Sequence, residues 1–358
     1  MAELGAGWSY KKSIVVDQTD DIGATNYQMK LTVHYGGADV DDVEATGIIH
    51  TPNASVTDFD DLRFTQSNGT TLIDYWIESK TDSDNAVVWV EIPMLDDAAD
   101  TTIRMYYGNA GASAPDTSHN MGVATFPFFD DFTIDDDGSA YTITDKWAGY
   151  TALAAVSGGI MTMTSDAITW KYIYGKTAQA NNVRVSMRAL HSTEQSMLGM
   201  GIEDNTSYYN MVMSHYNAAG SFWWGRAADP NSTVLSTTAP EVNVYHRYDY
   251  WRLLTGTDTH GAFYDGSARG SVTTTVSTVN FTPRAGVITS ATIIGICKID
   301  WVFMSNYTYT EPTWGSFGAE TSTGWANIAK INGIASANFS LVNGIAVADI
   351  SKVNGVAV

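Results

Sequence analysis

Short runs of alternating apolar and polar residues cover most of the chain, and they predict β-strands. Examples are Lys12–Val16, Met29–Tyr35, Val87–Ile92, Thr102–Tyr107, Val183–Arg188 and Tyr250–Leu254. Successive side chains of a strand point to opposite faces of the sheet, so such a run can pack one face on a core. We find no dozen residues with apolar positions three and four apart, the spacing of an amphipathic helix. The pattern therefore predicts an all-β protein.

Turn signals separate these runs along the whole chain. They include Asn68-Gly69, Asp137-Gly138, Gly158-Gly159 and Asp265-Gly266. Many short strands between such turns are typical of β-sandwiches and jelly rolls. Longer turn-rich stretches at 108–120 and 321–324 predict domain boundaries. We expect two β-sandwich or jelly-roll domains, at 1–118 and 119–320, and a short β-repeat tail at 321–358.

The tail repeats one eleven-residue phrase three times over residues 326–358. Each copy holds an Asn-Gly pair between β-branched residues, at Asn332-Gly333, Asn343-Gly344 and Asn354-Gly355. Asn-Gly accepts the two positive φ angles of a type I′ turn, so each copy is predicted to form strand, turn and strand. A unit this small must bury apolar residues such as Ile328, Phe339 and Ile350 against a neighbour.

The simplest cover for these apolar residues is the same tail of another subunit. We therefore expect a homo-oligomer, in which the tail either joins the subunits or anchors the protein. A trimer is the expected form, because a three-fold arrangement closes thin ladders around an axis without an open edge.

Composition and charge narrow the classes of partner. Charged residues make up 16% of the 358 residues, below the average of about 25%. The net charge of −20 argues against nucleic acid and against an anionic membrane as partner. No apolar run approaches the roughly 20 residues that span a bilayer. The N-terminus shows no secretory signal, and the single cysteine, Cys297, is expected in a buried strand.

An ordered series of short motifs runs through the first hundred residues. The motifs are Trp8–Ile14, Asn26–Gln28, Asp60–Thr65, Asp74–Glu78, Val88–Pro93 and Met105–Asn109. Together they resemble a domain of unknown function that is often found directly ahead of concanavalin/laminin-G-like domains.

A second set of motifs brackets the middle of the chain. It comprises Phe128–Phe132, Trp147, Ile299–Phe303, Glu311–Thr313 and Phe317–Glu320. These residues resemble a concanavalin-like sandwich, which implies a two-sheet jelly roll for carbohydrate or surface recognition and no defined reaction. The Asn-Gly tail is similar to tails on phage and archaeal-virus structural proteins.

A glycosidase on such a sandwich needs two carboxylates on one face of a strand. A retaining pair stands about 5–5.5 Å apart, which requires acids at alternating positions. Between residues 119 and 320 we find no such run, and Glu203 and Asp204 are adjacent, so they would face opposite sides. We therefore expect no catalytic residues. The seven histidines show no ligand-like pairing, so zinc is not expected either.

One acidic cluster is a candidate calcium site. Hard cations bind several oxygens that are usually gathered in one loop. Asp130, Asp131, Asp135 and Asp137 provide such oxygens, and concanavalin-like domains often carry a structural calcium. A solvated acidic turn is the alternative interpretation.

Clustered aromatic residues indicate glycan contact. Sugar rings present C–H faces that stack on exposed aromatic rings, while polar groups bind the hydroxyls. Our candidates are Tyr208, Tyr209, Trp223, Trp224 and Arg226. The alternative is that these rings fill a core or a subunit contact.

These observations together favour a virion structural protein of a prokaryotic virus, such as a fibre, spike or capsid-surface decoration. Its partners would be further copies of itself, other virion proteins and host-surface glycans, and it would lie at the virion surface. The rival hypothesis is a secreted or cell-surface carbohydrate-binding adhesin, or less favourably a glycan-degrading enzyme.

Overall fold

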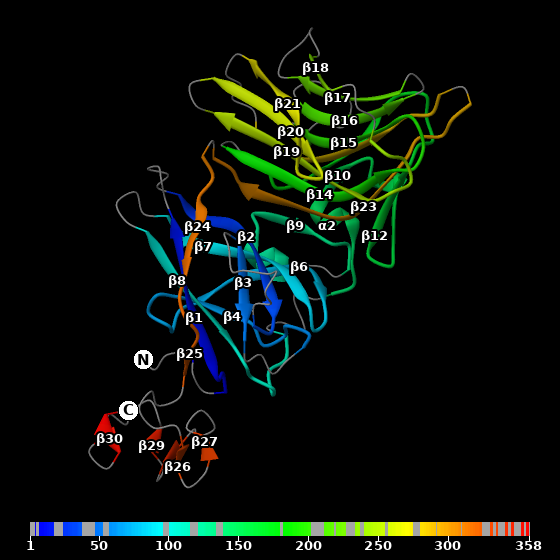
Figure 1. The fold of residues 1–358 in the computed structure, drawn as a ribbon. Coiled ribbons are helices and arrows are strands. Elements are labelled where there is room, and N and C mark those ends of the chain that lie inside the picture. Colours follow the sequence, from blue (N-terminus) through cyan, green and yellow to red (C-terminus); the bar gives the residue numbers. More distant parts are fainter. Residues whose placement is uncertain are drawn as a thin grey trace. The chain divides into compact units, whose positions relative to one another are not determined.

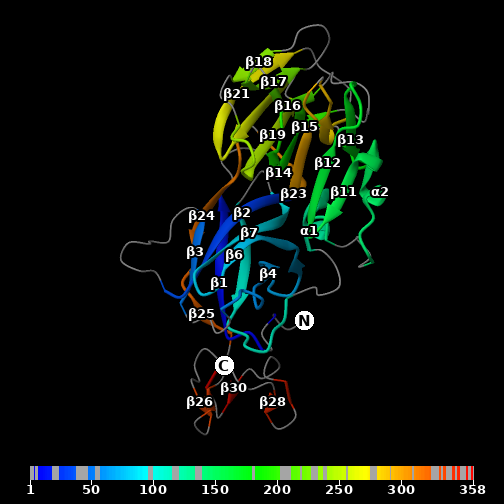
Figure 2. The same ribbon diagram turned by 90° about the vertical axis from the view of Figure 1, so that its right-hand side faces the viewer.

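Two compact units make up the chain in the computed structural model (Figures 1 and 2). The first unit comprises Met1–Thr117 and Thr310–Val358, and the second comprises Ser118–Tyr309. The structure describes residues 4, 7–17, 24–37, 47–52, 57–95, 100–114, 121–133, 139–179, 182–201, 211–217, 220–226, 233–236, 240–254, 257–274, 280–290, 292–308, 310–323 and six short strands between 330 and 357.

Strands dominate both units, and the predicted all-β fold is confirmed. Helical segments within the described residues are short: α1 (Met121–Thr125), α2 (Ile143–Lys146) and a 3-10 turn at Thr151–Leu153. None of the helices described here has the length and apolar character to cross a membrane.

The first unit is a sandwich of two sheets. One sheet has the order β24-β1-β8-β4-β5, with β25 also paired to β1, and the other has the order β3-β2-β7-β6. Their bounds are β1 (Tyr10–Asp17), β2 (Thr25–Tyr35), β3 (Ile48–Thr51), β4 (Arg63–Gln66), β5 (Leu72–Ile73), β6 (Tyr75–Thr81), β7 (Asn85–Met94), β8 (Thr101–Tyr107), β24 (Thr313–Phe317) and β25 (Thr321–Ser322). Alternate residues of both sheets, such as Ile14 and Val16 of β1 and Val88 and Val90 of β7, form one buried core.

Residues 310–323, which we call the strap, return to the first unit after the second is complete. β24 lies along β1, with Trp314 opposite Val16 and Phe317 opposite Ile14 (Figure 1). The sequence places residues 310–320 of the strap in the jelly roll and 321–323 in the tail. That boundary needs correction, because these strands extend the sheet of the first unit and the jelly roll ends at residue 309.

The second unit is a larger sandwich. Its front sheet has the order β10-β13-β22-β15-β16-β17-β18, and its back sheet has the order β11-β12-β23-β14-β19-β20-β21, with β9 paired to β23. The front strands are β10 (Trp147–Gly149), β13 (Lys171–Gly175), β15 (Ser196–Gly201), β16 (Met211–Asn217), β17 (Gly220–Arg226), β18 (Thr233–Ser236) and β22 (Thr282–Val287). The back strands are β9 (Phe128–Asp130), β11 (Ala154–Ser157), β12 (Ile160–Thr164), β14 (Val183–His191), β19 (His246–Leu254), β20 (Asp258–Tyr264), β21 (Ser267–Thr274) and β23 (Ile296–Asn306).

The core of the second unit follows the period of two that the sequence shows. Val183, Val185 and Met187 of β14 point inward, and Ile173 of β13 meets them from the front sheet. Cys297 of β23 lies in the same core, so its expected place in a buried strand is confirmed. Burial raises the pKa of its thiol to about 12, which keeps the group protonated.

The repeats of the tail form three separate antiparallel hairpins. They pair β26 (Lys330–Ile331) with β27 (Ile334–Ala335), β28 (Leu341–Val342) with β29 (Ile345–Ala346), and β30 (Lys352–Val353) with β31 (Val356–Ala357). Two residues separate each pair, as expected of an Asn-Gly turn. The predicted strands are confirmed. The assembly candidates Ile328, Asn332, Gly333, Phe339, Asn343, Gly344, Ile350, Asn354 and Gly355 lie outside the described residues.

Candidate functional site: an aromatic face of the jelly roll

An aromatic ladder, made of Trp170, Tyr172 and Tyr174, lies on the outer face of the front sheet. Ile173 belongs to the core, so the strand alternation places Tyr172 and Tyr174 on the opposite face. The Trp170 ring stacks on Tyr172, with centroids 5.9 Å apart and planes at 14°. The three aromatic residues, spaced two apart, thus share one face of the sheet.

Arg284 of β22 completes this face from the neighbouring strand. It is the register partner of Tyr174, and its guanidinium lies 4.4 Å from the centre of the Tyr172 ring. The ring lies across Gly286, where an added Cβ would come within 2.4 Å of it. Glycine at this position is therefore needed for the close contact between ring and backbone.

Burial differs along the ladder and decides which rings can contact a ligand. Tyr172 and Arg284 are both buried, and the Tyr172 hydroxyl donates to Met197 Sδ at 3.6 Å. Trp170 and Tyr174 remain half-buried. The electron-rich faces of these two rings can stack on the C–H groups of a sugar, while the arginine and Tyr172 hold the ladder in place.

Three predicted glycan residues lie in β17 of the same sheet. In the register of β16 and β17, Trp223 is opposite Ser214, Trp224 is opposite Met213 and Arg226 is opposite Met211. Met213, the register partner of Trp224, packs with Tyr172 and Met197 on the face that carries the ladder. The side chains of the three β17 residues, and all of Tyr208 and Tyr209, lie outside the described residues.

Sequence reasoning missed the ladder, although the signal was present. Trp170, Tyr172 and Tyr174 alternate over five positions, which in a strand places all three on one face. Adjacent aromatic residues such as Trp223 and Trp224 point to opposite faces of a strand. Alternate spacing, in contrast, gathers the rings on one face of the sheet.

Asp130 has a structural role that differs from the calcium ligation expected for it. Its Oδ1 accepts the Phe132 N–H at 2.9 Å, and its Oδ2 accepts the Tyr141 hydroxyl at 2.7 Å and Trp147 Nε1 at 2.6 Å. Burial raises the pKa of this carboxyl, although Lys146 and these donors oppose the change. Donor hydrogens on both oxygens leave a poor fit for a cation.

Of the other acidic candidates, Asp131 lies within the described residues. Thr133 donates two hydrogen bonds to Asp131 Oδ1, from its hydroxyl at 2.7 Å and from its N–H at 3.2 Å. Asp135 and Asp137 lie outside the described part of the chain. Throughout that part, no three His, Cys, Asp or Glu side chains are grouped to hold a metal ion.

A buried polar chain crosses the core of the second unit. His191 Nδ1 lies 2.7 Å from the Ser196 hydroxyl and its Nε2 lies 2.9 Å from that of Ser214, which in turn lies 2.8 Å from the Tyr250 hydroxyl. A serine next to a histidine suggests nucleophilic chemistry. All four side chains are buried, however, so this chain serves to satisfy polar groups within the sandwich.

The first unit holds a second polar cluster around a buried aspartate. Asp61 Oδ2 accepts the N–H groups of Gly108 and Asn109 at 2.6 and 3.0 Å. Burial raises the pKa of Asp61, and those N–H groups and Arg63 oppose the rise. The bond joins two of the motifs, Asp60–Thr65 and Met105–Asn109, that carry the N-terminal resemblance.

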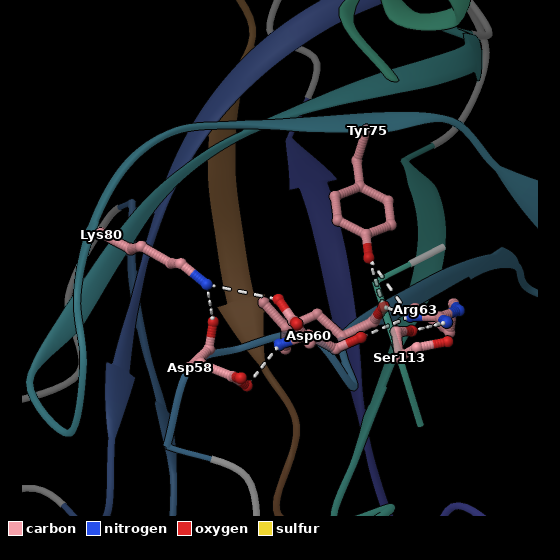
Figure 3. Close-up of polar contacts among 7 residues, drawn as sticks. Asp58, Asp60, Arg63, Tyr75, Lys80 and Ser113 are labelled. Atoms are coloured by element: carbon pink, nitrogen blue, oxygen red, sulfur yellow. Dashed lines mark hydrogen bonds and ion pairs between the residues drawn. The ribbon is translucent and has the colours of Figure 1, made fainter. Parts of the chain in front are cut away.

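Figure 3 shows the outer part of this cluster. Arg63 donates to the carbonyls of Asp60 at 2.9 Å and Ser113 at 2.8 Å, and Lys80 donates to the Asp58 carbonyl at 2.6 Å (Figure 3). Lys80 also pairs with the Asp60 carboxylate at 3.3 Å. Arg63 and Lys80 thus bind oxygens of the acidic loop at residues 58–60, and these bonds fix the loop in place.

Comparison with protein families gives one match. The model of a domain of unknown function (DUF2341) matches residues 58–149. The match confirms the resemblance of the N-terminal motifs from Asp58 onward. It also extends past residue 118 into the second unit as far as β10, so it includes both the Asp61 cluster and the hydrogen bonds of Asp130.

Comparison with curated proteins gave no match. Among solved structures, the Emp47p carbohydrate recognition domain is 10% identical and covers 51% of this chain and 96% of its own, with a TM-score of 0.38. A β-glucanase of Bacillus licheniformis is 9% identical over 50% of this chain and 98% of its own, with a TM-score of 0.37. A glycosyl hydrolase family protein from Mycobacterium fortuitum is 10% identical over 50% and 99%, with a TM-score of 0.37.

Proposed function

We propose that the protein is a structural protein at the surface of a prokaryotic virus particle, and that its jelly roll binds glycans of the host surface. The observation that carries glycan binding is the aromatic ladder, with its half-buried rings on the outer face of the front sheet. The proposal is one of binding without catalysis. Three buried aspartates lie in the back sheet: arginines hold Asp249 and Asp258, and Asp130 accepts hydrogen bonds on both oxygens.

The tail supports the assembly part of this proposal. Three successive hairpins with β-branched residues suit a segment that covers its apolar residues against other subunits or other virion proteins. The low share of charged residues means that Thr, Ser, Asn and Gly build much of the polar surface, a composition that suits a protein on the outside of a particle.

Replacement of Trp170 tests glycan binding. We expect Trp170→Ala to weaken binding on an array of bacterial surface oligosaccharides about tenfold, because one stacking ring is worth roughly 1 kcal/mol or somewhat more. Tyr245→Ala is the matched control, since Tyr245 is also half-buried but precedes a back strand. Equal binding by Trp170→Ala and the unaltered protein, with thermal unfolding unchanged, would remove the ladder as the site.

Removal of the tail tests assembly. We expect the full chain to have the mass of a trimer by light scattering, and a chain ending at residue 323 to have the mass of a monomer. The shortened chain keeps the strap, so the fold of the first unit serves as the control. A full chain that stays monomeric at high concentration would contradict the assembly role.

A further inference from the structure

A hollow of about 120 Å³ opens in the jelly roll just beyond the end of β13. Its lining includes the buried rings Phe126, Phe128 and Phe129 and the charged residues Asp145, Lys146 and Lys176. Its size suits a substituent of a sugar and part of its ring, and does not suit a long ligand.

Two ammonium groups line this hollow from different elements. Lys146 of α2 donates to the Phe129 carbonyl at 3.1 Å, and Lys176 donates to the Thr144 carbonyl. A carbonyl oxygen is neutral, so the bond to Thr144 orients the Lys176 ammonium and leaves its charge in place. Lys146 is buried and acts on Asp130 behind it, whereas Lys176 is exposed and faces any incoming group.

The strand that carries the ladder is locally basic in an acidic chain. Residues 167–183 contain Lys171 and Lys176 and no Asp or Glu, although the chain has 39 acidic and 19 basic residues. Arg284 adds a further positive charge opposite Tyr174. Lys171 has the parity of the core residue Ile173, so the positive charges on the ladder's side are those of Arg284 and Lys176. Asp145 lines the hollow as well and carries the opposing charge, whereas screening over about 8 Å at physiological salt weakens the effect of more distant acidic residues.

The ladder and the hollow follow each other along one strand. Trp170, Tyr172 and Tyr174 alternate on the outer face, and Lys176 is the next residue at this spacing, directly after β13. At about 3.3 Å per residue, the distance from Trp170 to Lys176 is roughly 20 Å. This length accommodates several sugar units.

We propose that the hollow binds the carboxylate of an acidic sugar, such as a uronic acid, within a glycan that stacks on the ladder. The exposed Lys176 ammonium donates to the carboxylate at the mouth of the hollow, while neighbouring sugar rings stack on Trp170 and Tyr174. This inference rests on the proposed glycan-binding function and adds the substrate class to it.

Calorimetric titration of the full-length protein with two matched trisaccharides tests this inference. The probes are trigalacturonic acid and the same trisaccharide with its carboxyl groups reduced to alcohols. We expect roughly tenfold tighter binding of the acid, the worth of one charge-assisted hydrogen bond. Lys176→Gln is expected to abolish this preference, whereas Lys298→Gln, on the back sheet, is expected to retain it.

Trp170→Ala separates the two proposals. It is expected to weaken both trisaccharides equally and to leave the preference for the acid intact. Equal affinity of the unaltered protein for both trisaccharides, or a preference that survives Lys176→Gln, would overturn the acidic-sugar inference and leave the ladder in place. Binding of neither trisaccharide at millimolar concentration would overturn the acidic-sugar inference, whereas glycan binding itself would be overturned only by absence of binding across the oligosaccharide array.

Discussion

A chain that ends at residue 309 is expected to lose the folded structure of its first unit. The strap supplies the edge strand β24 of that unit, and Trp314 inserts into its core with 5% of its surface exposed. The Trp314 Nε1 donates to the Lys30 carbonyl at 2.6 Å, and Tyr107 donates to the Glu320 carboxylate at 2.5 Å. The strap therefore contributes packing, backbone pairing and side-chain hydrogen bonds together.

The free-energy contributions of the strap are large compared with the stability of the first unit. Deletion of a buried tryptophan side chain alone costs about 3–5 kcal/mol, and each lost hydrogen bond adds about 1 kcal/mol. Domains of this size are stable by only about 5–15 kcal/mol. The summed cost approaches the whole free energy of unfolding, so the first unit is expected to be unfolded in the shortened chain.

Calorimetric scans of three chains measure this effect. The full chain and a chain ending at residue 323 should each show an unfolding transition for the first unit, and the chain ending at 309 should lack it. Trp314→Ala in the full chain should lower the temperature of that transition. A first unit that unfolds cooperatively without the strap would show that β24 is only an accessory strand.

The strands of this protein could be predicted from its sequence, but their assignment to sheets could not. Alternation alone places Val183, Val185 and Met187 on one face, and Asn-Gly pairs mark the hairpins of the tail. The strap, however, follows the jelly roll in sequence and belongs to the first unit. Pairing between Trp314 and Val16 joins residues far apart in the chain, and local pattern carries no information on such contacts.

In the candidate site, too, local sequence pattern predicts some features and strand pairing decides the others. The alternate spacing of Trp170, Tyr172 and Tyr174 was visible in the sequence, whereas the place of Arg284 over Tyr172 depends on the pairing of β13 with β22. Asp130 belongs to an acidic run that suggests calcium. Its partners Tyr141 and Trp147 come from outside that run, and only the fold brings them to the carboxylate.

Arg252 is a charged residue at an inward-facing position of a back strand. It alternates with Tyr248 and Tyr250 on β19 and therefore points inward, where it is fully buried. Its Nε donates to Asp258 Oδ1 at 2.9 Å, and its Nη2 donates to Asp258 Oδ2 at 3.0 Å. His260 Nε2 lies 2.8 Å from the same Oδ1, and Phe281 stacks 4.7 Å from the guanidinium.

Loss of one member of this buried group is expected to destabilise the jelly roll strongly. Asp258→Ala leaves the Arg252 charge buried without its carboxylate, and we expect a loss of about 3–5 kcal/mol in the free energy of unfolding. Arg252→Met combined with Asp258→Leu should recover most of that loss, because it removes both charges and keeps the volume. Urea titration followed by tryptophan fluorescence measures all three proteins. Equal stability of Asp258→Ala and the unaltered protein would contradict the role of the pair.

The same pair predicts how stability responds to acid. Burial raises the pKa of Asp258, but the hydrogen bonds and charges of His260 and Arg252 outweigh it and lower the pKa to about 2. An unfolded chain binds this proton near the ordinary value of about 3.9, so the folded state gains stability above that pH and loses it as the pH falls towards 2. Unfolding of the jelly roll between pH 5 and 2 should show this loss, and the Arg252→Met/Asp258→Leu protein should show less of it. An identical pH dependence in both proteins would mean that Asp258 does not stabilise the fold through its charge.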